Sequence, residues 1–427
     1  MRYKFLYSLI QRVFETFLWI IRPFHSKASK IVEGRKRWRT DVAAFRKNYP
    51  EENVIWIHAA SVGEFEQALP VIRLLKEADS TQKIAVSFFS PSGMEQKGNH
   101  PLVDFCFYLP SDTAGSMSQL LSALKPEALV LVKYEFWFNL LDACRQQNIP
   151  AISICCILRE SSFRNPFLRI HLQHCLPAFR YLFVQNAETA RLLRGLGIEN
   201  FRICGDTRID RVLEIRDSAQ EIDWLPAWKG AHKLLIVGSA WTEDVVFLKE
   251  FIRHAVVETD GLWRVLIVPH EVSEAQLQHI ESALAFPAMR FSNRREEEDC
   301  DVLLLDATGL LSRSYRYAEA AWIGGGFKTG LHNILEAAVY GIPVGFGPRH
   351  SKFREAGELI EAGVARSFSE AGSVWEFFQQ GSDGAELQQK IRQAAENYFQ
   401  SQKGAAQLIA EYLGELAHSP KNPYPGF

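Results

Sequence analysis

The segment "VIWIHAASVGEFEQALPVIRLL", residues 54–75, joins a strand pattern directly to a helix pattern. Its first four residues form an unbroken apolar run, which is typical of a buried strand. Ser61 and Glu64 then match a capping box, in which the two side chains bond each other's backbone N–H groups at a helix N-terminus. Apolar residues recur at helical spacing from Phe65 to Leu75. The segment predicts a strand followed at once by a helix, and it leaves open whether Glu64 is a helix cap or a working carboxylate.

The same junction repeats along the chain. The predicted strands are "NVIWIHA", "KIAVSFFS", "ALVLV", "AISICCI", "YLFVQ" and "FRICGD", then "KLLIVGS", "WRVLIVPHE", "DVLLLD", "EAAWIGGG" and "IPVGFGP". Each is followed by a segment with a helical period, and such alternation indicates a parallel sheet covered on both faces. A polar segment broken by proline separates the two series near residues 210–230. We therefore predict an α/β protein with two Rossmann-like halves.

Length and composition narrow the class of protein. At 427 residues the chain is too long for one ordinary core, so two domains are expected. The hydrophobic fraction of 47% is that of a globular protein, and a net charge of -2 argues against nucleic-acid binding through bulk charge. The 7 cysteines are scattered without a C-x-x-C pair, which favours reduced thiols in a cytoplasmic protein over disulfides or a zinc site.

The N-terminal segment has a different character. Residues 3–24 are dense in apolar and aromatic side chains, but polar residues recur among them at spacings that collect them on one helical face. This pattern favours a helix lying in a membrane interface over one that spans the bilayer. The basic segment that follows, up to Lys47, favours attraction to anionic lipid headgroups. No small-residue cleavage site follows, which disfavours a removed signal peptide. An ordinary packed helix followed by a solvated loop is the alternative.

Ligands of open parallel sheets bind beyond the carboxyl ends of the strands, so the loops after the strands are the places to examine. In the second half, "WIGGGFKTGLHNILEAAVYGIPVGFGP", residues 322–348, places three glycines after a strand and a helix after them. Glycine amides and a helix N-terminus can approach a phosphate, and Glu336 could accept both hydroxyls of a ribose. Tight turns between a strand and a helix use the same residues, so the glycines alone do not decide.

Several motifs together carry a family resemblance. They are "HAASVGE", "KPEALVLVKYEFWFNLL", "ILRESSFRN", "VQNAETARLLRGLGIENFRICGDTRIDR" and "GGGFKTGLHNILEAAVYGIPVGFGP", spread over roughly residues 54 to 360. In this order and spacing the chain resembles the 3-deoxy-D-manno-octulosonic acid (Kdo) transferases. These are inverting glycosyltransferases of the GT-B architecture that build the inner core of lipopolysaccharide.

The resemblance implies roles for individual residues. Glu64 would be the general base that takes the proton from the acceptor hydroxyl, while Glu135 and Arg208 would support the transition state. The positions that match donor-binding segments for CMP-Kdo are Ser239, Pro269, His270, Thr308, Gly309, Leu310, Gly325, Gly326, Asn333, Ile334, Leu335 and Glu336. A helix N-terminus would hold the Glu64 carboxylate in place and keep it ionised.

Two places depart from the family pattern. Many members carry Arg after the proline of the first donor segment, whereas His270 stands here, which puts a fixed positive contact to the donor phosphate in question. Where the family commonly shows Gly-Asn-x-Lys, this chain has Gly205, Asp206, Thr207 and Arg208. Arginine keeps the charge and adds a bidentate fork, so its role can survive the change. The residues alone give no reason for Asp206.

The implied function is inverting transfer of Kdo from CMP-Kdo, a co-substrate, to a hydroxyl of a lipid A precursor (lipid IVA). The resemblance implies no metal or other cofactor. Its expected surroundings are the anionic surface of the inner membrane, on the cytoplasmic face, in a Gram-negative bacterium, with neither nucleic acid nor a protein partner. A GT-B transferase or epimerase acting on a UDP-sugar and a non-catalytic membrane adaptor are the alternatives.

The expected fold class is α/β of the GT-B type, with two Rossmann-like domains facing across a cleft and an N-terminal amphipathic membrane-anchoring helix. The expected parts are a membrane-associating helix and basic segment at 1–47, an acceptor-binding domain at 48–212, a linker at 213–230 and a nucleotide-sugar-binding domain at 231–427. The last helix of the chain is a candidate for packing back on the acceptor-binding domain.

Overall fold

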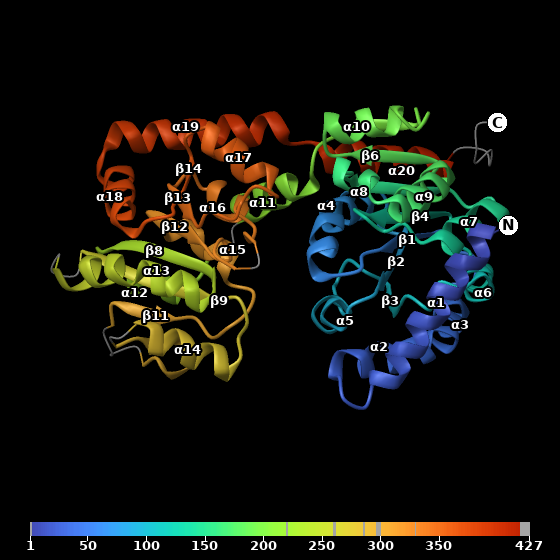
Figure 1. The fold of residues 1–427 in the computed structure, drawn as a ribbon, viewed down its shortest axis with the longest axis horizontal. Coiled ribbons are helices and arrows are strands. Elements are labelled where there is room, and N and C mark those ends of the chain that lie inside the picture. The colour runs from blue at the N-terminus through green and yellow to red at the C-terminus, as the bar shows by residue number, and fades with distance from the viewer. Residues whose placement is uncertain are drawn as a thin grey trace. The chain divides into compact units, whose positions relative to one another are not determined.

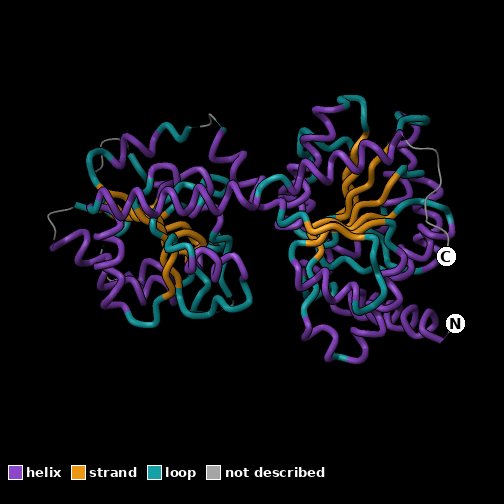
Figure 2. Tube along the Cα trace, turned by 90° about the horizontal axis from the view of Figure 1, so that it is seen from above, coloured by secondary structure: helices purple, strands orange, loops and turns teal. Residues whose placement is uncertain are grey.

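The computed structural model describes residues 2–218, 221–258, 262–284, 287–295, 300–328 and 330–418. The end of the last predicted domain, residues 419–427, lies outside this range. The chain forms two compact units: unit 1 comprises Met1–Arg211 and Lys403–Phe427, and unit 2 comprises Val212–Gln402. Each unit contains a 7-stranded sheet, and Figure 2 shows helices on both faces of each sheet. The predicted α/β architecture with two Rossmann-like domains is confirmed.

In unit 1 the strand order is β3-β2-β1-β4-β5-β6-β7, and neighbouring strands are parallel (Figure 1). Its strands are β1 (Val54–His58), β2 (Lys83–Phe88), β3 (Phe105–Tyr108), β4 (Ala128–Val132), β5 (Ala151–Cys156), β6 (Tyr181–Val184) and β7 (Phe201–Ile203). Its helices are α1 (Arg2–Ile21), α2 (Ser26–Lys36), α3 (Trp38–Asn48), α4 (Val62–Ala78), α5 (Pro91–Lys97), α6 (Ala114–Leu124), α7 (Phe138–Gln146), α8 (Glu160–Arg164), α9 (Pro166–Cys175), α10 (Ala187–Arg194), α20 (Ala405–His418) and α11 (Thr207–Asp217), which includes the boundary between the units.

The central strands of unit 1 are buried along their whole length, which explains why they read as apolar runs and not as alternating patterns. Two apolar clusters cover the two faces of the sheet, one including Trp56 and Phe107 and the other Ile57 and Phe65. Strand β3 is not among the predicted strands, because it is a four-residue edge strand that is only partly buried. The order reverses between β1 and β4, so the loops that follow these two strands are neighbours.

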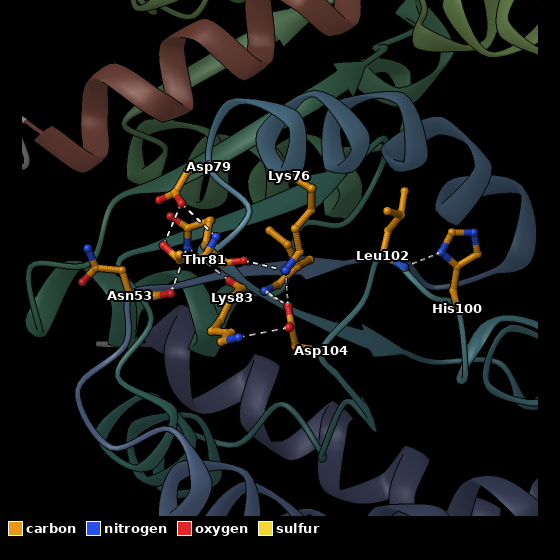
Figure 3. Close-up of polar contacts among 10 residues, drawn as sticks. Asn53, Lys76, Asp79, Thr81, Lys83, His100, Leu102 and Asp104 are labelled. Carbon is orange, nitrogen blue, oxygen red and sulfur yellow. Dashed lines mark hydrogen bonds and ion pairs between the residues drawn. The ribbon is translucent and has the colours of Figure 1, made fainter.

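Helix α4 is fixed to the sheet near its C-terminus by Asp104 (Figure 3). Nζ of Lys76 on α4 lies 2.7 Å from Oδ2 of Asp104, and Nζ of Lys83 on β2 lies 3.6 Å from Oδ1. The same carboxylate accepts the backbone N–H of Ile84 at 2.8 Å. The three charged side chains are each less than one-fifth exposed, with values of 15%, 18% and 17%. A mostly buried cluster of charged side chains at the amino edge of the sheet therefore sets the position of α4.

The last described helix, α20, belongs to unit 1, where Figure 1 shows it in red beside blue and green elements. Ile409 and Leu413 of α20 pack in the apolar cluster that contains Phe65 of α4. The carboxylate of Asp210 accepts the backbone N–H groups of Gly404 and Ala406 at 2.7 and 2.8 Å. These bonds satisfy amides at the start of α20 and fix where the chain returns to unit 1.

Helix α1 turns its polar side chains toward unit 1. Lys4 pairs with Asp142 of α7 at 2.5 Å, the Tyr7 hydroxyl donates to Asp112 at 2.7 Å, and Glu15 pairs with Arg35 of α2 at 2.5 Å. The exposed side of α1 carries large apolar residues, among them Phe5, Leu6, Leu9, Ile10, Val13, Phe14, Phe17, Trp19 and Ile20. None of the helices in the described ranges is long and apolar enough to cross a bilayer. Membrane association of residues 1–47 stays a prediction.

In unit 2 the strand order is β10-β11-β9-β8-β12-β13-β14, again with parallel neighbours. Its strands are β8 (Lys233–Ala240), β9 (Trp263–Pro269), β10 (Met289–Arg290), β11 (Val302–Leu304), β12 (Ala320–Ile323), β13 (Val344–Phe346) and β14 (Ala365–Ser367). Its helices are α12 (Trp224–Lys229), α13 (Thr242–Arg253), α14 (Glu274–Leu284), α15 (Leu311–Ser314), α16 (Leu335–Ala338), α17 (Arg354–Glu361), α18 (Val374–Asp383) and α19 (Ala385–Gln402). The unpredicted strands β10 and β14 are two and three residues long and lie at the sheet edges.

Residues 213–230, expected as a linker, are not a separate part of the molecule. Unit 2 begins at Val212, and α12 packs into it through buried Leu225 and Trp228. The Trp228 indole donates to the backbone oxygen of Cys300 at 2.9 Å. The helix escapes prediction because it is six residues long, contains a proline and buries only two side chains.

Candidate active site

The structure places Glu64 at the carboxyl edge of the unit 1 sheet, where the strand order reverses. The predicted capping box is present: the Ser61 backbone N–H donates to Oε2 of Glu64 at 3.0 Å, and the Glu64 N–H donates to Oγ of Ser61 at 3.4 Å. Gly63, between them, is exposed and has open space around it. Glu64 is therefore a helix cap whose carboxylate is held at the carboxyl edge of the unit 1 sheet.

Burial and a second carboxylate control the ionisation of Glu64. Burial raises the pKa of Glu64, and the charge of Glu135 raises it further; the charges of His58 and Lys133 and the bond from Ser61 oppose this change. The net direction is upward, so the helix amides favour the ionised form of Glu64 without determining its pKa. The capping bond acts in the expected direction, but desolvation outweighs it. A carboxylate with a raised pKa is a stronger base once it is ionised.

Glu135 follows β4 and lies beside β1, as the strand order requires. Its Oε2 accepts the Trp137 indole N–H at 2.5 Å and lies 3.2 Å from Nε2 of His58. Its side chain is 13% exposed, whereas His58 is fully buried. Glu135 is thus oriented from two sides, and the structure brings it within electrostatic range of Glu64.

Arg208 lies at the start of α11, where it is paired with Asp206. Its Nε donates to Oδ2 of Asp206 at 2.9 Å, and Gln67 of α4 and Gln185 donate to the same carboxylate at 2.9 and 2.8 Å. Burial opposes ionisation of Asp206, but the charge and bonds of Arg208 outweigh it and lower the pKa of Asp206. These contacts explain why Asp206 stands here. Its carboxylate accepts hydrogen bonds from three segments and links Arg208 to Gln67 of α4.

The predicted donor residues of unit 2 lie after neighbouring strands at one edge of its sheet. Ser239 is the second-last residue of β8, Pro269 ends β9 with His270 just after it, and Gly325 and Gly326 follow β12. The turn that contains Thr308, Gly309 and Leu310 follows β11, and its first two residues are exposed. All these segments leave the carboxyl ends of parallel strands, which is where ligands of such sheets bind.

The glycine run after β12 packs more tightly than the sequence suggested. A Cβ on Gly324 would lie 2.2 Å from the backbone oxygen of Ser239, and one on Gly326 would lie 2.6 Å from the backbone of Gly347. The Gly325 N–H already donates to the buried carboxylate of Asp244 at 3.0 Å. Helix α16 is only four residues long, so it contributes little helix dipole. The Gly325 amide is thus already paired, and the expectation that the glycine run approaches a phosphate stays a prediction.

Three aromatic rings form a stack beside this turn. Trp241 lies 4.7 Å from His270 and His270 lies 4.3 Å from His332, measured between ring centroids. The Trp241 indole donates to Nε2 of His332 at 3.1 Å. Burial lowers the pKa of His270, and burial with the charge of His270 lowers the pKa of His332 to about 4. At neutral pH the stack is uncharged and can accept or donate hydrogen bonds.

The predicted ribose-binding segment is partly buried. The Asn333 side-chain amide donates to Oε1 of Glu336 at 2.9 Å, and Oδ1 of Asn333 is buried without a hydrogen-bond partner in the described structure. Ile334 and Leu335 are 0% and 1% exposed, so their side chains belong to the core and only their backbone could contact a ligand. Glu336 and Asn333 remain as the polar side chains of this segment that could do so.

No group of three or more His, Cys, Asp or Glu side chains that could hold a metal ion occurs in the described ranges. The expected independence of metals stays a prediction.

Known proteins match this chain over most of its length. Residues 36–211 match the family described as "3-Deoxy-D-manno-octulosonic-acid transferase (kdotransferase)". The chain is 26% identical to the 3-deoxy-D-manno-octulosonic acid transferase of Aquifex aeolicus, over 74% of this chain and 84% of that protein. It is 27% identical to the protein of the same name from Haemophilus influenzae, over 85% of this chain and 87% of that protein. Over most of its length the chain is similar to the Kdo transferases.

The fold of this chain also occurs in other enzymes. A crystal structure of UDP-GlcNAc 2-epimerase from Neisseria meningitidis bound to UDP-GlcNAc matches with a TM-score of 0.63 and 16% identity, covering 85% of this chain and 100% of that chain. At this identity the likeness concerns the fold alone, which is GT-B-like in both.

Some residues at this site were missed by reasoning from the sequence. No role or contact was predicted for His58, Trp137, Trp241 or Asp244. The contact of His58 could have been found from the strand order, because His58 ends β1 and Glu135 follows the neighbouring strand β4. For the others the contacts depend on side-chain directions across different loops, which no local pattern reveals.

Proposed function

We propose that this protein is an inverting glycosyltransferase that moves Kdo from CMP-Kdo to a hydroxyl of a lipid A precursor, lipid IVA. The observation that carries the proposal is the pair of carboxylates, Glu64 and Glu135, at the point of strand reversal in a chain similar to the Kdo transferases. Such a pair supplies the one base that the reaction needs, and the capping box fixes its direction.

In the proposed reaction the acceptor oxygen attacks the anomeric carbon of Kdo while its proton passes to Glu64. The new C–O bond forms as the bond from the anomeric carbon to the phosphate oxygen breaks, and CMP leaves with that electron pair. Glu135 raises the basicity of Glu64 through its charge. Arg208 is the proposed cation for the charge that develops on the departing phosphate, and Asp206 holds it in place. The scheme uses no metal ion.

The proposed donor site is the carboxyl edge of the unit 2 sheet. Trp241 and His270 offer a flat surface beside β8 and β9, and Glu336 with Asn333 offers polar groups for a ribose. His270 replaces the arginine that many family members carry. Because burial lowers the pKa of His270, we propose that it contacts the donor phosphate by a hydrogen bond and gains positive charge only when the phosphate is bound.

The proposed acceptor is a lipid, and unit 1 carries a surface suited to its membrane. The exposed apolar residues of α1 continue onto α9, where Phe167 and Ile170 are 78% and 45% exposed. The two helices are joined by the Tyr3 hydroxyl, which lies 2.5 Å from Nδ1 of His171. With the basic residues of α2 and α3, this surface would rest on anionic lipid at the cytoplasmic face of the inner membrane of a Gram-negative bacterium.

The deciding experiment incubates the purified protein with CMP-Kdo and a tetra-acylated lipid A precursor and reads the products by mass. We expect the acceptor to gain the mass of Kdo and CMP to be released. UDP-sugars in place of CMP-Kdo test the main alternative, and thermal shift with CMP against UDP reports which nucleotide binds. Transfer or epimerisation of a UDP-sugar, with no reaction of CMP-Kdo, would refute the proposal. A non-catalytic adaptor predicts that Glu64→Gln still complements loss of the gene.

A further inference from the structure

His58 is an unusual side chain for the end of a central strand. It is fully buried, and each of its ring nitrogens has a defined neighbour. Nδ1 lies 3.0 Å from the backbone oxygen of Ser87 and 2.9 Å from its Oγ, while Nε2 lies 3.2 Å from Oε2 of Glu135. The Ser87 hydroxyl in turn accepts the indole N–H of Trp56 at 2.8 Å. A buried chain of bonds thus runs from the core to Glu135.

The groups around the ring limit where its protons can be. Nδ1 can donate to the Ser87 carbonyl or accept the Ser87 hydroxyl proton, so its contacts fit either state. An ionised Glu135 can only accept, so Nε2 must carry a proton to bond it. Nε2 is therefore the donor that holds the Glu135 carboxylate.

We propose that His58 is the positioning residue of Glu135: it holds the Glu135 carboxylate by its Nε2–H and offsets its charge toward Glu64. The consequence for the reaction rests on the proposed function, in which Glu64 is the base. His58 itself is too deeply buried to touch a substrate. In this proposal Glu135 raises the pKa of Glu64, and His58 limits that rise so that Glu64 is still ionised when the reaction begins.

The charges around Glu64 make this balance specific. Glu135 opposes its ionisation, while His58 from β1 and Lys133 from the segment after β4 favour it. The other charges beside the start of α4 are paired with one another: Glu66 with Lys97 and Arg211, and Asp206 with Arg208. Removing His58 therefore leaves the Glu135 charge opposed by Lys133 alone.

The first test needs no substrate. The full-length protein is labelled with ¹⁵N-histidine, and the His58 signals are assigned by their loss in His58→Gln. We expect Nε2 to carry a proton, because it faces the Glu135 carboxylate. An unprotonated Nε2 would overturn the proposal. The result is independent of Kdo transfer, so it stands even if the proposed function fails.

The second test compares pH–rate profiles in the transfer assay. His58→Met removes both donor and charge, and we expect a roughly 10- to 100-fold loss of kcat with an acid limb moved to higher pH. Glu135→Gln should move the limb to lower pH, and the double variant should lie near the wild type. His58→Gln restores a donor without charge, so it should recover much of kcat but keep the displaced limb.

The matched control is His100→Gln, another histidine near α4, whose ring lies 5.3 Å from that of Phe65. We expect it to leave the limb unmoved. If His58→Met fails to fold, His58→Gln and Glu135→Gln still give limbs displaced in opposite directions. Equal profiles for these two variants and the wild type would overturn the proposal, as would rescue of the limb by His58→Gln.

Discussion

Replacing Glu64 by glutamine separates its two roles. Glutamine keeps an oxygen that can accept the Ser61 N–H, so the capping box can still close, but it cannot take a proton. Loss of a general base lowers kcat by roughly 100- to 10,000-fold. We therefore expect a variant that is folded and binds donor but does not transfer Kdo at a useful rate.

The effect on stability follows from the environment of the carboxylate. A neutral side chain loses a charge-assisted bond, which costs about 1 kcal/mol, but it also avoids burying a charge beside Glu135. Since the pKa of Glu64 is raised in the folded state, ionisation makes wild-type stability fall as pH rises through the folded value. The free energy of unfolding of Glu64→Gln should therefore improve relative to wild type as pH rises from the unfolded pKa, about 4.3, through the folded pKa.

Glu66, on the same helix, is the matched control. Burial opposes its ionisation, but Arg211 and Lys97 outweigh burial and lower the pKa of Glu66. Its ion pairs stabilise the fold above the unfolded pKa and are lost as pH falls through the folded value, so Glu66→Gln should destabilise at neutral pH and spare kcat. Urea titrations at several pH values and the mass-based transfer assay measure both. A fully active Glu64→Gln, or pH trends of the same sign in both variants, would refute the reasoning.

Three further outcomes are expected. Asp104→Ala should lower the free energy of unfolding by about 2 kcal/mol in urea titration, because Lys76 and Lys83 lose a half-buried partner, while the donor KM stays the same; a lowered melting temperature with a changed KM would contradict this. Asp206→Asn should cost about 2 kcal/mol at pH 7 and less in acid, since the lowered pKa of Asp206 means that its stabilisation is lost as pH falls through the folded value. Phe5→Ser should reduce sedimentation with anionic liposomes and leave transfer to a water-soluble acceptor intact; unchanged liposome binding would remove α1 from the proposed membrane surface.

The parts of the fold that depend on short-range chemistry could be predicted from the sequence. The capping box lies within four residues, and its two bonds form as the pattern indicates. The fully buried strands of both sheets are apolar runs long enough to recognise. Strands β3 and β14 escape because an edge strand of three or four residues buries too little to leave a pattern. The six-residue helix α12 escapes for the same reason.

The identities of the site residues could be predicted from the sequence, but the contacts between their side chains could not. The approach of Glu64 and Glu135 follows from the strand order of unit 1, which no local sequence pattern reveals. The bond between His58 and Glu135 depends on a side-chain direction at a strand end, and the use of the Gly325 amide by Asp244 depends on the packing of two loops. The sequence pattern of α1 reveals a polar stripe but not that the stripe faces the protein.

The docking of α1 has a consequence for the order of events during synthesis. Its polar stripe is satisfied by Asp112, Asp142 and His171, which lie 105, 138 and 168 residues further along the chain. At about 10 residues per second, the ribosome supplies these partners some 10 to 17 s after α1 has emerged. In that interval the helix has an exposed apolar face, and its polar contact between Glu15 and Arg35 of α2 can form but these three cannot. If α1 binds a membrane as proposed, the nascent chain would meet lipid before its first domain is complete.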